Sequence, residues 1–117
     1  MDSPSECLFC KIAQRIVPAQ VLSESGDWIA FRDVQPQAPV HCLIIPKRHV
    51  DNLSDPHLKD PALVGSMLLE LARLAKELGV AASGYRVVAN CHRDAGQSVG
   101  HLHFHLLAGR AMHWPPG

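Results

Sequence analysis

The spacing of apolar residues predicts one long helix near the middle of the chain. Between residues 61 and 78, apolar side chains recur at steps of three and four, which places them in one stripe along a helix. Asp60 is a suitable N-cap, Pro61 suits the first helical position, and Gly79 favours a stop at the C-terminal end. The predicted stripe contains Leu63, Val64, Met67, Leu68, Leu71, Leu74, Ala75 and Leu78.

Shorter apolar runs on both sides of this helix predict strands. The turn residues 25–27 separate the first two runs as in a hairpin, and Pro46 ends the third. A brief helix is predicted over residues 11–17, where Pro18 stops it. Hairpins outnumber strand–helix–strand units, so we expect an α+β fold with a mostly antiparallel sheet. The predicted strands span residues 20–23, 28–32, 41–45, 85–90 and 101–107.

Length and charge narrow the class of protein. The 117 residues suit one domain, and an apolar content of 47% with 19% charged residues excludes a disordered chain. Lys plus Arg and Asp plus Glu both number 11, so the chain lacks the positive field of a nucleic-acid-binding protein. Its apolar runs fall far short of the ~20 residues that span a bilayer. We therefore expect a single domain over residues 1–117, with a polar lead at 1–6, in the cytoplasm and without nucleic-acid or membrane partners.

Three histidines alternate with apolar residues in one short segment. On a strand, alternate side chains share a face, so His101, His103 and His105 are predicted to lie on the same side. Three imidazoles in register serve little structural purpose, which favours a chemical role over a solvent-exposed strand face. The opposite face is then filled by Leu102, Phe104 and Leu106.

Two kinds of chemistry fit these three imidazoles. Three histidines and an open position are typical of catalytic zinc, although ~6.6 Å between alternate residues strains one tight site. The other possibility is a nucleophilic imidazole, which attacks phosphorus and then leaves again through a covalent intermediate. Asn90 and Ser98 lie upstream and could hold phosphate oxygens or protonate a leaving group, but each is also an ordinary turn residue.

Several blocks of sequence resemble the histidine triad (HIT) family, and within it the histidine triad nucleotide-binding proteins. The segment 101–107 has the His-x-His-x-His pattern followed by two apolar residues. Further similar blocks follow the family order at residues 31–39, His41, 45–49, 95–99 and 114–117. The resemblance implies a HIT-like fold, in which a five-stranded sheet carries one long and one short helix and joins a second sheet across a homodimer.

The resemblance also implies an activity and roles for the matched residues. The activity is that of a purine nucleoside phosphoramidase, which cleaves adenosine 5′-monophosphoramidate to AMP through a nucleotidyl-histidine. His103 would be the nucleophile, His101 would orient it, and Asp33 would accept hydrogen bonds from the ribose. The implied catalytic residues are His41, Ser98, His101, His103 and His105. The implied nucleotide contacts are Leu8, Phe9, Phe31, Asp33, Val34, Asn90, Gly96, Gln97, Ser98, His103, His105 and, from the tail 112–117 reaching the partner subunit, Trp114.

Some matched residues have simpler alternatives, and two positions depart from the family pattern. Asp33 also suits a turn cap, while Phe9 and Phe31 also suit an ordinary core. Residues 91–94 occupy a loop that is more often acidic and glycine-rich in the animal members, and Gly100 replaces a frequent aromatic. Both departures leave the nucleophile intact and the preferred leaving group open.

The cysteines suggest a metal site. Cys7 and Cys10 have the two-residue spacing that lets two thiolates bind one ion, although they could also pack as small apolar groups. The residues alone do not identify further ligands. The resemblance implies that His49 and His101 complete a structural zinc site, so that catalysis itself needs no cofactor. Cys42 lies in an apolar strand and is predicted to be buried.

Three hypotheses about function therefore arise from the sequence. The first is a hydrolase that cleaves the P–N bond of purine nucleoside 5′-phosphoramidates through covalent His103. The second is a zinc hydrolase in which His101, His103 and His105 bind the metal. The third is a nucleotide-sensing or protein-interaction module with weak activity.

Overall fold

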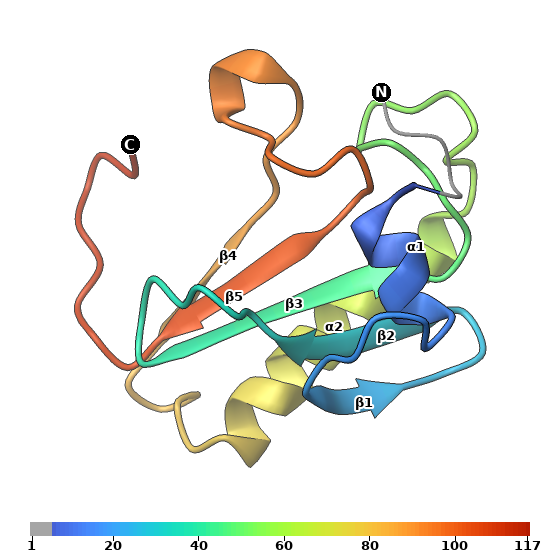
Figure 1. Cartoon of the computed structure of the whole chain (residues 1–117). Coiled ribbons are helices and arrows are strands. Elements are labelled where there is room, and N and C mark those ends of the chain that lie inside the picture. Colours follow the sequence, from blue (N-terminus) through green and yellow to red (C-terminus); the bar gives the residue numbers. More distant parts are fainter. Residues whose placement is uncertain (1–5) are drawn as a thin grey trace.

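The computed structural model describes residues 6–117 and contains one antiparallel sheet of five strands in the order β1-β2-β3-β5-β4 (Figure 1). The predicted α+β class and antiparallel sheet are confirmed, and most of the predicted lead 1–6 lies outside the described residues. The strands are β1 (Val21–Glu24), β2 (Trp28–Arg32), β3 (Val40–Pro46), β4 (Tyr85–Val88) and β5 (Phe104–Ala108).

The long helix α2 (Pro61–Glu77) covers one face of the sheet (Figure 1). Its N-cap is Asp60, whose carboxylate accepts a hydrogen bond from the Leu63 backbone N–H at 3.1 Å. The buried side of α2 packs against β3 and the β5 region in one hydrophobic core. Leu68, which the sequence placed in the apolar stripe, is instead 39% exposed. The core residues contributed by α2 are Met67, Leu71, Leu74 and Ala75.

The short helix α1 (Leu8–Ala13) lies on the opposite face, above β2 and β3 (Figure 1). The predicted bounds of 11–17 were wrong at both ends. The helix starts earlier because Phe9 and Cys10 pack into a second core formed with β2 and β3. It ends before Pro18, because Arg15 takes a left-handed conformation with φ 63°.

The last strand is shorter at its start than the sequence predicted. It begins at Phe104 rather than His101, because only from Phe104 onward does the segment pair with β3. Before that point the Leu102 N–H donates to the carbonyl of Val50, in the loop beyond β3. The alternation nevertheless holds, since Leu102, Phe104 and Leu106 lie in the core beneath α2.

Strand β4 forms one edge of the sheet and exposes apolar side chains. It ends at Val88 rather than Asn90, and Tyr85 and Val87 are 39% and 38% exposed. Leu69 on α2 is 73% exposed. In the described part of the chain, neither helix combines the length and apolar character that a membrane span requires.

Candidate active site and metal centre

A pocket of about 520 Å³ lies on the α1 side of the sheet. Its lining combines apolar side chains, including Phe9, Ile12 and Phe31, with histidines and Asp33. A pocket lined by both apolar and polar side chains suits a ligand with an aromatic ring and a charged end. The predicted site residues that line the pocket are Leu8, Phe9, Phe31, Asp33, Val34, His41, Ser98, His103 and His105.

The hydrogen bonds of His103 determine which ring nitrogen can react. Its Nδ1 lies 2.7 Å from the carbonyl oxygen of His101. A carbonyl can only accept, so Nδ1 carries the proton and Nε2 keeps its lone pair. Burial lowers the pKa of His103, whose ring packs edge-on against Phe9 at 5.1 Å. At neutral pH this side chain is therefore a neutral imidazole with a basic nitrogen left for a ligand.

A second pair of histidines forms a chain of hydrogen bonds that begins at the backbone. The Gln37 N–H donates to His41 Nδ1 at 3.0 Å, so the proton of neutral His41 lies on Nε2. That Nε2 is 2.9 Å from His105 Nδ1 and 3.4 Å from a carboxylate oxygen of Asp33. His105 accepts at Nδ1 and consequently presents an N–H at Nε2. The adjacent rings of His103 and His105, 5.0 Å apart, thus offer a lone pair and a donor, respectively.

Burial keeps this pair of histidines neutral. It lowers the pKa of His41, with Asp33 opposing the shift. It also lowers the pKa of His105 to about 4, assisted by the neighbouring His103 and His41. Both rings are therefore hydrogen-bonding groups rather than cations at neutral pH.

Asp33 lines the pocket and also caps the turn that follows β2. One of its carboxylate oxygens accepts the Gln35 N–H at 2.8 Å, as expected for a turn cap. The other faces His41.

Four predicted contacts do not line the pocket of the described chain, namely Asn90, Gly96, Gln97 and Trp114. The Gln97 side chain instead supports the backbone of its own loop. Its amide nitrogen donates to the carbonyls of Asp51 and Val99 at 2.7 and 3.0 Å, and its amide oxygen accepts the His92 N–H. Sequence reasoning missed Gln37, which acts through its backbone, where the side-chain identity carries no signal.

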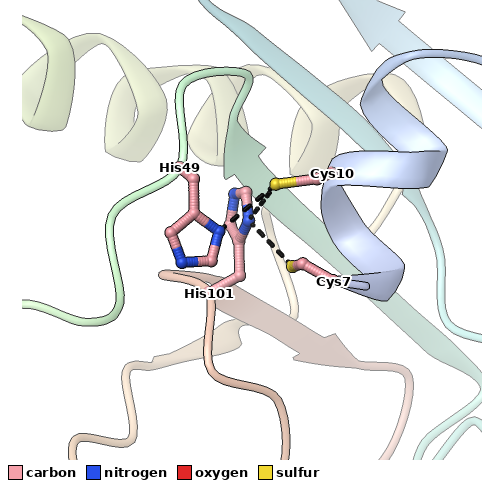
Figure 2. A group of neighbouring side chains, drawn as sticks. All are labelled: Cys7, Cys10, His49 and His101. Atoms are coloured by element: carbon pink, nitrogen blue, oxygen red, sulfur yellow. Dashed lines mark hydrogen bonds between the residues drawn. The ribbon is translucent and has the colours of Figure 1, made fainter. Parts of the chain in front are cut away.

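A separate buried cluster lies beside the pocket (Figure 2). It forms where α1, the loop after β3 and the start of the triad segment, residues 101–107, meet. Its members are Cys7, Cys10, His49 and His101, whose ligand atoms all lie within 4.8 Å of one another. His101 Nδ1 is 3.3 Å from the Cys7 sulfur and 3.5 Å from the Cys10 sulfur, which is also 3.2 Å from His49 Nδ1.

The donor set of this cluster fits a metal ion. His101 Nε2 donates to the Pro46 carbonyl at 2.8 Å, and His49 Nε2 donates to Asp51 at 2.9 Å. Both Nδ1 lone pairs therefore point to the sulfurs, as in metal sites with oriented histidines. Without a cation, burial raises the pKa of the Cys10 thiol to about 11, with the Cys7 thiol adding to the shift. Two thiolates and two imidazoles are typical of closed zinc sites.

The alternative of zinc bound by three triad histidines is not supported by this geometry. Within residues 6–117, two sets of side chains gather enough ligand atoms for a metal, and neither unites His101, His103 and His105. Both ring nitrogens of His101 are directed elsewhere. The second set joins Asp33, His41 and His105, but the Gln37 N–H fixes the His41 proton on the nitrogen that a metal would need.

Comparison with known proteins identifies the family of this chain. A family model of the HIT domain matches residues 14–112. The chain belongs to the HIT domain family. A crystal structure of a HIT family hydrolase from Legionella pneumophila is 49% identical, covers 95% of this chain and 99% of its own, and superposes with a TM-score of 0.91.

Two further relatives extend the comparison. An uncharacterised HIT-like protein of Synechococcus elongatus is 46% identical over 96% of this chain and 97% of its own length. The crystal structure of a zinc-bound histidine triad family protein from Mycobacterium smegmatis is 30% identical, covers 92% of this chain and 78% of its own, and has a TM-score of 0.78.

The free energy of unfolding of this HIT protein is expected to fall as the pH drops from 6.5 towards 4, with His105 among the groups responsible. The folded-state pKa of His105, about 4, is depressed by burial and by His103 and His41, while Asp33 opposes the shift. Unfolded chains therefore bind a proton that the folded state rejects, which costs up to about 1.4 kcal/mol per pH unit for one such group. Thermal unfolding between pH 7.5 and 4.5 measures this loss.

The variant His105→Asn should lose less stability over the same pH interval than the parent. His113→Ala is the matched control, because His113 is exposed and lies outside the pocket. An unchanged acid slope in His105→Asn would contradict the assignment.

Proposed function

We propose that this HIT protein hydrolyses the P–N bond of purine nucleoside 5′-phosphoramidates, such as adenosine 5′-monophosphoramidate, to the nucleoside monophosphate. The observation that carries the proposal is the unprotonated Nε2 of His103, a neutral imidazole in a pocket lined by both apolar and polar side chains. Imidazole attacks phosphorus well and also leaves well, so it divides one difficult displacement into two steps.

In the first step, His103 Nε2 forms a bond to the α-phosphorus and the P–N bond to the amine breaks. The leaving nitrogen takes a proton from solvent by way of the Ser98 hydroxyl. Positive charge then develops on the His103 ring, whose Nδ1–H is already directed at the His101 carbonyl. The Nε2–H of His105 donates to a phosphate oxygen, and His41 holds His105 in that tautomer.

In the second step, water attacks the same phosphorus and the bond to His103 breaks. The nucleoside monophosphate leaves, the proton lost by water passes to solvent, and His103 recovers its lone pair. The purine lies against Phe9 and Phe31, while Asp33 accepts hydrogen bonds from the ribose hydroxyls.

Zinc is the metal that best suits Cys7, Cys10, His49 and His101. Four protein ligands close the coordination shell, so the ion would connect α1 to the loop after β3 and to the triad segment without a free position for substrate. Its contribution would be to folding and not to a chemical step.

The decisive experiment incubates the protein with adenosine 5′-monophosphoramidate and follows AMP by chromatography. Formation of AMP at a rate proportional to protein concentration is expected. If the folded protein bound AMP but released none from the phosphoramidate, the hydrolase proposal would be wrong and a nucleotide-sensing module would replace it.

The functional unit is a homodimer that uses the β4 edge and the adjoining surface of α2. Tyr85, Val87 and Leu69 leave an apolar surface beside an unpaired strand edge, which symmetric pairing with a second copy would cover. The tail lies beside β4, because Arg86 donates to the His113 carbonyl at 2.9 Å. Trp114 is 83% exposed and in the dimer reaches toward the partner's nucleotide.

Deletion of residues 114–117 is expected to change the ranking of substrates with different leaving amines more than it changes stability. Residues 114–117 are exposed and belong to neither hydrophobic core cluster, so their loss removes substrate contacts rather than core packing. Turnover of a series of adenosine phosphoramidates, together with the melting temperature, tests this. An unchanged ranking, or a light-scattering mass near the 12.8 kDa of one chain, would contradict the proposal.

A further inference from the structure

We propose that Arg110 is a positioning residue that fixes the tautomer of His41 and, through His41, the proton that His105 presents to the substrate. The inference concerns the same site as the proposed phosphoramidase and in that respect rests on it. The side chain of Arg110 itself is not among the residues that line the pocket.

Arg110 acts on the loop that precedes β3. Its Nε and Nη2 both donate to the Gln37 carbonyl, at 3.2 and 3.1 Å, although the two residues are 73 positions apart. Two N–H groups of one guanidinium on one oxygen hold that oxygen in a defined direction. The third contact, from Nη1 to the Ala111 carbonyl at 3.1 Å, fixes the guanidinium itself.

The backbone conformation at Gly109 brings Arg110 close to this loop. Strand β5 ends at Ala108, and Gly109 then turns the chain with φ +91°. A Cβ at Gly109 would lie only 2.8 Å from Pro39 Cβ, so the close contact requires glycine. The Gly109–Arg110 turn therefore packs against Pro39 and binds the Gln37 carbonyl two residues earlier.

The same residue, Gln37, connects this turn to the active site. Its carbonyl accepts from Arg110 and its N–H donates to His41 Nδ1. Gln37 is otherwise exposed, and its side chain donates only to the nearby Gln35 carbonyl within the described residues. The carbonyl and the N–H of Gln37 lie on either side of its Cα, so the anchor at the carbonyl restrains the direction of the N–H through the Gln37 backbone. This anchor comes from the end of β5, which lies beside the start of β3 in the sheet.

The direction of that N–H decides what His105 offers to a phosphate. While Gln37 donates to Nδ1, the His41 proton must lie on Nε2, facing His105 Nδ1 at 2.9 Å. If the Gln37 N–H turned away, the His41 proton could move to Nδ1. His105 would then donate at Nδ1 and turn a bare lone pair toward the phosphate oxygens. A stabilising donor would be exchanged for a repulsive contact.

The test compares Arg110→Ala and Arg110→Lys with Arg15→Ala, in the full-length protein. Arg15 is a suitable control because its guanidinium is also exposed, pairs with Glu24 alone among residues 6–117, and does not line the pocket. Nitrogen-15 NMR of the His41 ring at pH 7.5 reports the tautomer directly. Steady-state hydrolysis of adenosine 5′-monophosphoramidate reports kcat and KM separately, and the melting temperature reports stability.

For Arg110→Ala we expect His41 to change from the single Nε2–H tautomer to a mixture, with kcat reduced about tenfold and KM changed much less. Arg110→Lys should restore part of both signals, and Arg15→Ala should leave both unchanged. A His41 tautomer that stays unaltered in Arg110→Ala would overturn the proposal, as would a fall in kcat no larger than that in Arg15→Ala.

The NMR result does not depend on turnover. If the parent protein failed to cleave the phosphoramidate, the proposed function would fail, while the His41 tautomer would still decide the role of Arg110. If Arg110→Ala were too unstable to study, Gly109→Ala would provide the second variant, since its Cβ displaces Pro39 and should alter the His41 tautomer in the same direction.

Discussion

Replacing His103 with alanine is expected to reduce the turnover of adenosine 5′-monophosphoramidate by a factor on the order of 10⁴ or more. The substitution removes the nitrogen that forms the bond to phosphorus, and no neighbouring imidazole among the described residues directs a free lone pair into the pocket. His105 presents a proton in that direction, and both nitrogens of His101 are engaged elsewhere. AMP binding and the fold should be largely retained, because the core beneath α2 does not include His103.

The covalent intermediate offers an independent measurement. With a substrate whose second step is slow, intact-mass spectrometry of the parent protein should show an added nucleotidyl group, and peptide mapping should assign it to His103. No adduct is expected in His103→Ala, whereas His57→Ala should retain the adduct and the activity, since His57 lies outside the pocket. Unchanged turnover in His103→Ala would refute the covalent mechanism.

Removal of the metal is expected to lower the melting temperature by about 10 °C or more, while activity measured at low temperature persists. The proposed ligands connect segments that are distant in sequence, so the ion contributes several kcal/mol to folding, and each kcal/mol corresponds to about 4 °C in a domain of this size. Cys7→Ser should reproduce the effect. Cys91→Ser is the matched control, because Cys91 is a half-buried thiol outside the cluster.

Elemental analysis of protein purified without added metal gives the zinc content of each variant. Zinc should be present in the parent and in Cys91→Ser, and lost from Cys7→Ser. Complete inactivation of a protein that stays folded after chelation would overturn the structural assignment and favour a catalytic metal.

The elements that the sequence predicted well are those governed by local interactions. Helix α2 starts at Pro61, one residue after the predicted N-cap Asp60, because capping and the proline preference act within one turn. The strand β2 was predicted at its observed bounds, since its ends coincide with a turn and a polar loop. The sequence also identified His103 as the candidate nucleophile. Alternation along an extended segment places neighbouring imidazoles on one side, and this does not depend on the rest of the fold.

Elements governed by distant contacts were not predictable in this way. The bounds of α1 depend on where Phe9 and Cys10 meet β2 and β3, and the start of β5 depends on its pairing with Ile44. The residues that α1 and β5 contact are distant in sequence. Local propensity therefore predicts ends that differ by several residues from those that packing produces.

By itself the sequence determined the class of fold, the long helix and the residues with reactive side chains. Tertiary structure alone decided their protonation, because the tautomers of the pocket histidines follow from backbone groups that the fold brings to His103 and His41. The His101 carbonyl leaves His103 with a free Nε2, and the Gln37 N–H gives His105 its donor. Backbone carbonyls and N–H groups are the same in every residue but proline, so no sequence pattern reveals which of them will face a given ring.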